Sequence, residues 1–281
     1  MASTALEDAA ILSKLQPVEY YKKWIEALYP TRPNGRKVDD FLPVKIIAGP
    51  IENADFSTTV NVGGTIVVVT AFFEVCEAPV SPKQPRGHIV PNVTFCAGCS
   101  PVIRAGPPGE RAQVLSKQVS DIINRIIDLD ALLFAEGRLV WVLYIDALVV
   151  SDAGSVFSAI WLGVIAVLKS LRFPPVRIDE KNGVALYGDA TDGGSTVVFK
   201  ANPVPLNFAY IAEKDALIAD PDENEECVLD GQTLTMLVDQ KSKSIIYYEC
   251  QSIPSRIFEL NFLEHAPVNS QLNVLADLLN Q

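Results

Sequence analysis

The 281-residue sequence lacks the features of several large classes of protein. Its first ten residues hold no basic stretch followed by an apolar one, so we expect no secretory signal. Five cysteines do not make a disulfide framework in a chain of this length, and an odd number without a signal fits a reducing compartment. The longest uncharged apolar stretch, 153–168, is shorter than the roughly 20 residues that span a bilayer. We therefore expect a buried helix there, and no membrane contact.

Motifs for cofactor chemistry are also scarce. Neither G-x-G-x-x-G nor a Walker A loop occurs, which argues against a glycine-rich cradle for a nucleotide. The two histidines, His88 and His265, are isolated from any nucleophile and define no catalytic triad. One C-x-x-C motif joins Cys96 to Cys99, but no second pair stands at zinc-ligand spacing, and the motif lies in a predicted loop, not at the start of a helix. We expect no metal and no cofactor.

Acidic and apolar residues are what the sequence has in excess. It carries 34 acidic and 23 basic residues, a formal net charge of -11, and 49% of its residues are apolar. This composition excludes a mainly disordered chain and a protein that grips nucleic acid over its whole surface. The charge is uneven, because 213–230 holds eight acids and one lysine, whereas 81–119 holds five basic residues and one acid. An acidic body with one basic strip is compatible with local contact to RNA.

Hydrophobic periodicity predicts an α+β fold. The elements expected in the first half are a helix within 5–28, strands at 56–62, 65–73 and 88–90, a helix at 110–127, a strand at 138–150 and a helix at 156–171. Gly63-Gly64 suits a tight hairpin, because both positions accept positive φ. The nearly continuous apolar character of 138–150 predicts a strand buried on both faces.

The second half repeats the order of strands first and helix after. Its expected elements are strands at 195–200, 208–212, 216–219, 233–238 and 244–249, and helices at 256–265 and 271–279. We expect an N-terminal helical extension over 1–30, a first half over 31–190 and a second half over 191–281. The two halves are predicted to form one compact, duplicated unit.

Six short motifs follow one another along the chain. They are RPNGR at 32–36, VNVGGT at 60–65, VPNV at 90–93, RAGPPGE at 104–110, GRLVWVLYID at 137–146 and ADPDENEE at 219–226. In this order and spacing they resemble the RNase PH-like subunits of the eukaryotic RNA exosome ring, over roughly residues 16–265. The resemblance implies an RNase PH-like fold, with duplicated β-α-β-α units, mixed sheets and buried central helices.

The same resemblance implies partners and a cellular place. Such subunits pack head to tail between two RNase PH-like neighbours in a hexameric ring, on which S1/KH-type cap subunits sit. RNA passes through the central channel toward a nuclease attached elsewhere. The implied role is RNA processing, including that of ribosomal RNA, and RNA degradation, in the nucleus, the nucleolus and the cytoplasm.

Active members of the family degrade RNA from its 3′ end with phosphate as the nucleophile. Two anions must then lie side by side, so a helix N-terminus with an arginine and hydroxyl groups is the natural binding site. The resemblance places this site at the turn before 156–171, where active relatives carry Thr/Ser-Arg-Thr/Ser. Here Val156 and Phe157 stand in place of the arginine, and only Ser155, Ser158 and the helix N-terminus remain. We therefore expect weak phosphate binding.

Active relatives also carry two aspartates, six residues apart, that hold a metal or act as a general acid. The resemblance puts Glu226 and Gln232 at these places, and glutamine neither titrates nor replaces the charge of a ligand. Both parts of the catalytic apparatus look degenerate, which predicts no catalysis. For the acidic segment 213–230 as a whole, we expect a solvated loop, the alternative being a remnant metal site.

Four basic residues are candidate RNA contacts: Lys83, Arg86, Arg104 and Arg111. Arg104 ranks first, because the matching loop of family members faces the channel, and Arg111 ranks second, because a first helical turn suits a phosphate. The alternative is a surface arginine without a partner, or an ion pair between subunits. Arg32 and Arg36 are instead predicted to stabilise their own turn.

Three functions are thus compared. The favoured one is a non-catalytic ring subunit that builds the RNA channel. The second is an active phosphate-dependent 3′-to-5′ exoribonuclease, which requires tight phosphate binding. The third is an unrelated α+β interaction protein whose motif matches are accidental.

Overall fold

A computed structural model describes most of the chain. The described residues are 11–16, 19–21, 23–24, 31–51, 54–77, 86–101, 103–134, 139–178, 185–187, 195–211, 216–229, 232–250 and 266–279. Lys83, His265 and the helix expected at 256–265 lie outside them, as does most of the N-terminal extension. No helix within these ranges is long and apolar enough to cross a membrane.

The first sheet has the strand order β1-β2-β3-β6-β4. Its strands are β1 (Val44–Ala48), β2 (Phe56–Val62), β3 (Thr65–Glu77), β4 (His88–Phe95) and β6 (Leu139–Ser151), and the short β5 (Leu133–Phe134) also pairs with β6. β4 runs parallel to β6, and the other pairs are antiparallel. The predicted β2–β3 hairpin is confirmed: Val62 pairs with Thr65, and the two glycines between them have positive φ.

The prediction that β6 is buried on both faces is wrong. Its burial alternates from Leu143 onward, and Tyr144, Leu148 and Val150 are 38–41% exposed. The reason is that both long helices lie on one face. α3 (Glu110–Ile126) packs on β4, whose buried residues Ile89 and Val93 pair with inward-facing residues of β6, and α4 packs on the same side. The opposite face has no helix over it in the described part of the chain.

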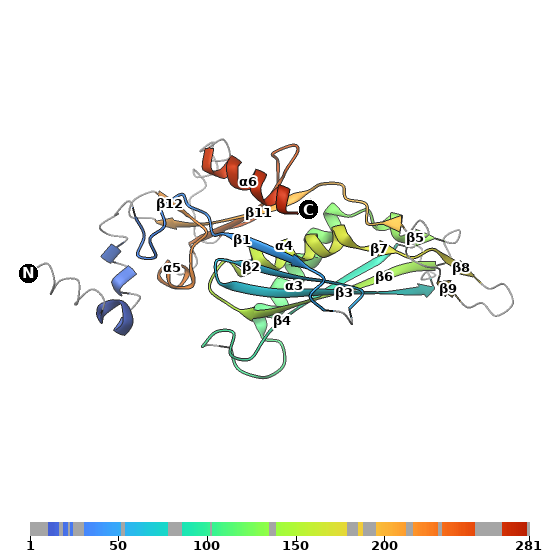
Figure 1. Cartoon of the computed structure of the whole chain (residues 1–281), viewed down its shortest axis with the longest axis horizontal. Helices are drawn as coiled ribbons and strands as arrows, with labels where there is room; N and C mark the ends of the chain where they lie inside the picture. Colours follow the sequence, from blue (N-terminus) through green and yellow to red (C-terminus); the bar gives the residue numbers. More distant parts are fainter. Residues whose placement is uncertain are drawn as a thin grey trace, which may run out of the picture.

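Helix α4 (Val156–Ser170) is the central helix of the molecule (Figure 1). It contacts β2, β3 and β6 of the first sheet and β11 of the second, and eleven of its fifteen residues are buried. Trp161 is fully buried, and its indole N–H donates to the carbonyl of Pro203 at 3.4 Å. The apolar stretch therefore forms the buried helix that its composition predicts.

The second sheet is antiparallel with the order β12-β11-β13-β14. Its elements are β11 (Pro203–Ile211), β12 (Ala216–Ala219), β13 (Thr233–Asp239) and β14 (Ile245–Cys250), with α5 (Glu223–Val228) after β12 and α6 (Ala266–Leu278) near the C-terminus. The remaining small elements are the 3-10 turn η1 (Leu129–Leu132) and the pairs β7 (Arg172–Phe173) with β10 (Ser195–Thr196) and β8 (Val176–Ile178) with β9 (Ala185–Tyr187).

The strand expected at 195–200 is shorter than predicted. Only Ser195–Thr196 pairs as a strand, because the following residues bond to the end of α3. Lys200 N–H donates to Ile126 O, and Asp128 N–H donates to Val198 O. One apolar core contains buried residues from both sheets, the first in sequence being Val60 and the last Leu279. The α+β class is confirmed, while the domain boundaries at 30 and 190 stay a prediction.

Candidate functional site

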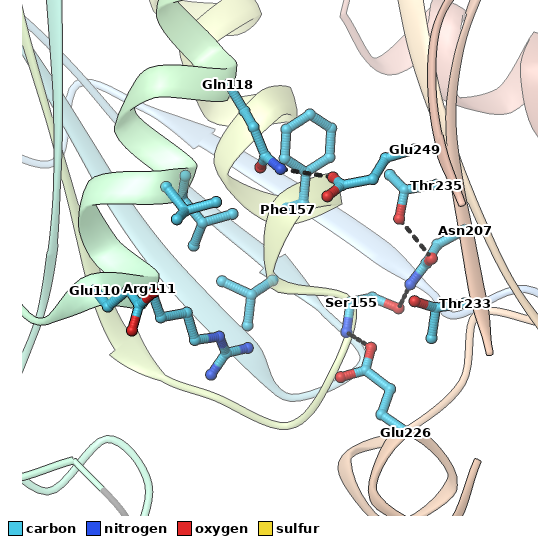
Figure 2. Close-up of a pocket in the computed structure, with 13 residues that line it drawn as sticks. Glu110, Arg111, Gln118, Ser155, Phe157, Asn207, Glu226, Thr233, Thr235 and Glu249 are labelled. Carbon is cyan, nitrogen blue, oxygen red and sulfur yellow. Dashed lines mark hydrogen bonds between the residues drawn. The ribbon is translucent and has the colours of Figure 1, made fainter. Parts of the chain in front are cut away.

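A cavity of about 540 Å³ lies where the N-terminal ends of α3 and α4 face the second sheet (Figure 2). Its lining residues are Glu110, Arg111, Val114, Leu115, Gln118, Ser155, Val156, Phe157, Asn207, Glu226, Thr233, Thr235 and Glu249. The cavity thus brings together five predicted site residues from distant parts of the chain: Arg111, Ser155, Val156, Phe157 and Glu226. This cavity is therefore the candidate functional site of the chain.

The turn into α4 is tightly packed against the start of α5. Gly154 has φ +100°, and a Cβ on it would lie 2.8 Å from backbone atoms of Pro221, Asp222 and Glu223. Thr65 Oγ1 holds the turn from the other side, donating to Gly154 O at 2.6 Å and accepting from the N–H of Ala153 at 2.9 Å. Only glycine fits this position, because it combines left-handed backbone with a close approach of two chains.

The hydroxyl of Ser155 is hydrogen-bonded to other residues of the protein. It has φ +52° and is 2% exposed. Its Oγ donates to Pro221 O at 3.3 Å and accepts from Asn207 Nδ2 at 3.0 Å. Asn207 Oδ1 in turn accepts from Thr235 Oγ1 at 3.0 Å. The hydroxyl that sequence analysis left for phosphate is therefore already satisfied by neighbouring residues.

The N-terminus of α4 is capped by a carboxylate of the chain itself. The backbone N–H of Ser155 donates to Glu226 Oε1 at 2.8 Å, as Figure 2 shows. A helix N-terminus favours an anion, because its free N–H groups and its dipole both carry positive charge. Burial raises the pKa of Glu226 to about 7, against the opposing effects of the Ser155 N–H and of Arg111. Glu226 is thus the acceptor at this helix N-terminus.

The other residues of the turn present no positive charge to the cavity. Val156 is 4% exposed, and Phe157 stacks between Trp161 and Tyr247 with ring centroids 6.3 and 6.2 Å away. Ser158 is 5% exposed, does not line the cavity, and its buried Oγ has no hydrogen-bond partner within the described chain. At the predicted phosphate turn, Glu226 therefore already accepts from the Ser155 N–H, and no cation of the turn faces the cavity.

Gln232 does not line the cavity, although the next residue, Thr233, does. The carbonyl of Gln232 accepts the N–H of Tyr210 at 2.7 Å next to β13. Its side-chain oxygen is buried and has no partner in the described part of the chain. Glu226, but not Gln232, therefore lines the cavity at the N-terminus of α4.

The expectation of a solvated acidic loop is wrong for the described part of 213–230. Asp222 caps α5 in a capping box with Glu225, so the segment forms a short helix. Glu225 is fully buried, with Arg32 Nη1 at 3.4 Å and Arg36 Nη2 at 3.6 Å. Asp220 is 5% exposed, and burial raises its pKa to about 6. The Asp-x-x-Glu spacing was the sequence signal for this helix start.

Arg32 confirms its predicted structural role. It is 2% exposed and donates to the carbonyls of Val38 and Ala219 at 2.5 Å, in addition to its ion pair with Glu225. Arg36 donates to Asp220 O at 2.9 Å. The two arginines tie the turn at 32–36 to the end of β12 and to α5. Across the described residues, no group of three or more His, Cys, Asp or Glu side chains could hold a metal.

The basic strip is largely neutralised by acids from outside it. Three of its cations form ion pairs: Arg86 with Asp130 at 3.2 Å, Arg111 with Asp152 at 2.6 Å and Lys117 with Asp121 at 2.7 Å. Arg111 also lies over the ring of Phe95. Arg104 is exposed beside a smaller cavity and has no ion pair within the described ranges. It remains the free cation of the described strip.

The polar residues on the opposite wall of the cavity were not predicted from the sequence. Asn207 and Thr235 come from β11 and β13, and Gln118 Nε2 donates to Glu249 Oε2 at 2.6 Å across the cavity. Every residue of β11 is buried, and Asn207 is the one amide among its apolar side chains. A buried polar side chain needs a hydrogen-bond partner, so Asn207 was the available signal.

Comparison with known proteins assigns the class. Residues 40–174 match the family model described as 3′ exoribonuclease family, domain 1, or RNase PH. The exosome complex component Rrp42 of Thermococcus gammatolerans is 32% identical over 211 residues, which cover 74% of this chain and 75% of that protein. The chain belongs to the RNase PH family of 3′ exoribonucleases.

Two further relatives, one compared by sequence and one by structure, are also exosome proteins. The exosome complex component rrp43 of Schizosaccharomyces pombe is 29% identical over 244 residues, 84% of this chain and 85% of that protein. A solved chain of the Archaeoglobus fulgidus exosome with RNA bound to the active site matches with a TM-score of 0.73 and 24% identity, over 96% of this chain and 98% of that one. The predicted RNase PH-like fold is confirmed, and an unrelated interaction protein is excluded.

Proposed function

We propose that this chain is a structural, catalytically inactive subunit of the hexameric RNase PH-like ring of the RNA exosome. Its work is to complete the ring and to form part of the wall of the RNA channel, which supports 3′-to-5′ RNA processing and degradation. The family membership and the naming of its relatives as exosome components support this role.

The observation that carries the inactivity is the contact between Ser155 and Glu226. Phosphorolysis needs positive charge for two adjacent anions, and at the turn into α4 a carboxylate already accepts from the Ser155 N–H. Val156 and Phe157 are apolar where active relatives carry arginine, and Gln232 is not among the residues that line the cavity. A phosphate entering this site would meet Glu226, Glu110 and Glu249, and Arg111 is already paired with Asp152.

The proposal includes partners. Two RNase PH-like neighbours flank the subunit, S1/KH-type cap subunits sit on the ring, and RNA passes along the exposed Arg104. The proposed location is the nucleus and nucleolus, with a further pool in the cytoplasm. Within the family, the opening residues around Trp24 and the strand β6 most resemble the subunit called exosome component eight.

The test is a phosphorolysis assay on the full chain, alone and assembled with its ring partners. An RNA with a single-stranded 3′ tail is mixed with inorganic phosphate and Mg²⁺, and nucleoside diphosphates are measured. We expect none from the chain alone, and any release from neighbouring subunits should be unchanged by Glu226→Ala. The matched control is Glu223→Ala, which removes the same charge from the exposed side of α5. Diphosphate release that Glu226→Ala abolishes and Glu223→Ala leaves intact contradicts the proposal.

A further inference from the structure

The C-x-x-C motif forms a tight turn at the end of β4. The N–H of Cys99 donates to Cys96 O at 3.1 Å, and Gly98 has φ +85°. A four-residue turn with this bond and a positive φ at its third position is a type II β-turn, whose end Cα atoms lie within about 7 Å. Disulfides join Cα atoms about 4.4–6.8 Å apart, so the turn brings the two cysteines into the range for a bond.

Both ends of this turn are anchored to β6 and its following loop. The N–H of Cys96 donates to Val149 O at 2.9 Å, which continues the parallel ladder between β4 and β6. The N–H of Asp152 donates to Cys99 O at 3.1 Å. Because the backbone is held at each cysteine, closing a bond between the sulfurs orders little additional chain. Nothing lies within 4 Å of a Cβ built on Gly98, so the turn has free space on its outer side.

The two thiols differ in access. Both are free, Cys96 has intermediate exposure, and Cys99 is 9% exposed. Burial raises the pKa of the Cys99 thiol, with the nearby Asp152 carboxylate acting in the same direction. A thiolate is the reactive form of cysteine, so the accessible Cys96 is suited to react first and the buried Cys99 to react second.

We propose that Cys96 and Cys99 form a reversible disulfide by exchange with small disulfides of the oxidised glutathione type. The Cys96 thiolate attacks one sulfur of the small disulfide, which forms a mixed disulfide and releases one small thiolate. Cys99 then loses its proton and attacks the Cys96 sulfur, which releases the second small thiolate. Two protein thiols are oxidised, one small disulfide is reduced to two thiols, and the two protons pass to those thiolates.

This modification site is independent of the proposed function. It lies next to the Arg111–Asp152 ion pair, because the backbone N–H of Asp152 donates to the carbonyl of Cys99. The disulfide would link Cys96 covalently to Cys99, whose carbonyl accepts from the N–H of Asp152. The bond therefore acts on the rim of the cavity without using any group that lines it.

The test equilibrates the full chain with mixtures of reduced and oxidised glutathione, blocks remaining thiols with iodoacetamide and maps the peptide that contains both cysteines. We expect the two thiols to lose alkylation together and the peptide mass to fall by about 2 Da, without a glutathione adduct. The exposed Cys76 is the internal control and should form a mixed disulfide instead.

Two variants separate the steps. Cys99→Ser removes the resolving thiol, so a glutathione adduct on Cys96 should accumulate. Cys96→Ser leaves the buried Cys99, which should stay largely unmodified in the folded chain. The proposal is overturned if the wild-type chain keeps both thiols alkylatable at equilibrium, or if it accumulates the Cys96 adduct to the level of Cys99→Ser.

Discussion

Glu225 and Glu226 are neighbours on α5, yet they belong to two different regions of the molecule. Glu225 points into the cluster around Arg32 and Arg36, is fully buried, and has two guanidinium groups within 3.6 Å. Glu226 points to the cavity at the start of α4, where the Ser155 N–H is its hydrogen-bond donor among the described residues. One carboxylate is compensated by full charges and the other by a helix end.

The difference separates a structural carboxylate from a site carboxylate. A buried charge with charged partners stabilises one arrangement of the chain, and removing a partner is costly. A carboxylate that depends on a backbone donor can be replaced by another anion or protonated near neutral pH. The comparison predicts that substitutions at the two positions affect different properties.

The largest expected effect is at Glu225. Glu225→Ala leaves Arg32 and Arg36 without their counter-charge, and we expect the free energy of unfolding to fall by about 3–5 kcal/mol. Urea titration of the purified chain measures it. Glu223→Ala, at an exposed position on the same helix, is the control and should change stability by less than about 1 kcal/mol. Equal losses for both variants would remove the distinction between the two faces of α5.

The second effect is a pH dependence at Glu226. Its folded pKa of about 7 lies above the ordinary value of 4.5, so the folded state binds its proton more tightly than the unfolded state. This contribution to stability is fully present below about pH 4.5 and is lost as the pH rises through 7. Wild type should therefore lose stability relative to Glu226→Gln between pH 5 and pH 8. Denaturant titrations across that range measure the difference, and parallel profiles for the two chains would contradict it.

The third effect concerns phosphate. Glu226→Ala frees the Ser155 N–H and removes a negative charge, so we expect inorganic phosphate to bind about tenfold more tightly, as for one charge-assisted hydrogen bond. Isothermal titration calorimetry measures the dissociation constant. Glu249→Ala is the matched control, because it removes a carboxylate from the same cavity without freeing that donor. Because Glu249→Ala frees Gln118 Nε2 instead, an equal gain in both variants would show that the effect is not specific to the Ser155 N–H.

The smallest expected effect is at the free cation Arg104. Arg104→Ala should weaken binding of single-stranded RNA to the assembled ring and lower the salt slope of log K by about 0.7, the value for one phosphate contact. The control is Arg86→Ala, whose side chain is already paired with Asp130 and should change the slope less. Filter binding at several salt concentrations gives both slopes. A larger loss for Arg86 would reverse the assignment.

Local patterns predicted local structure well. The two glycines between β2 and β3 and the apolar stretch of α4 each contain the information for their own element. The burial of β6 was beyond the sequence, because an apolar residue on an exposed sheet face looks the same as one in the core. Leu148 illustrates this, since it is exposed whereas Leu143 of the same strand is buried.

The candidate site was predictable only in part, because its contacts join distant residues. Ser155 and Glu226 were each named from the sequence, but their hydrogen bond spans 71 positions. The basic strip seemed unpaired because Asp130 and Asp152 lie beyond its limits in sequence. The charge of a sequence segment counts only the residues within it, whereas ion pairs in the folded chain join residues that lie far apart in sequence.

Gly154 has a mechanical consequence. The start of α4 and the start of α5 touch through backbone at this glycine, with no side chain between them that could change rotamer and absorb a displacement. A shift of α5 is therefore transmitted directly to the first turn of α4, and Glu225 and Ser155 move as parts of one rigid joint. We therefore expect substitutions that shift the start of α5 to move the Ser155 N–H as well.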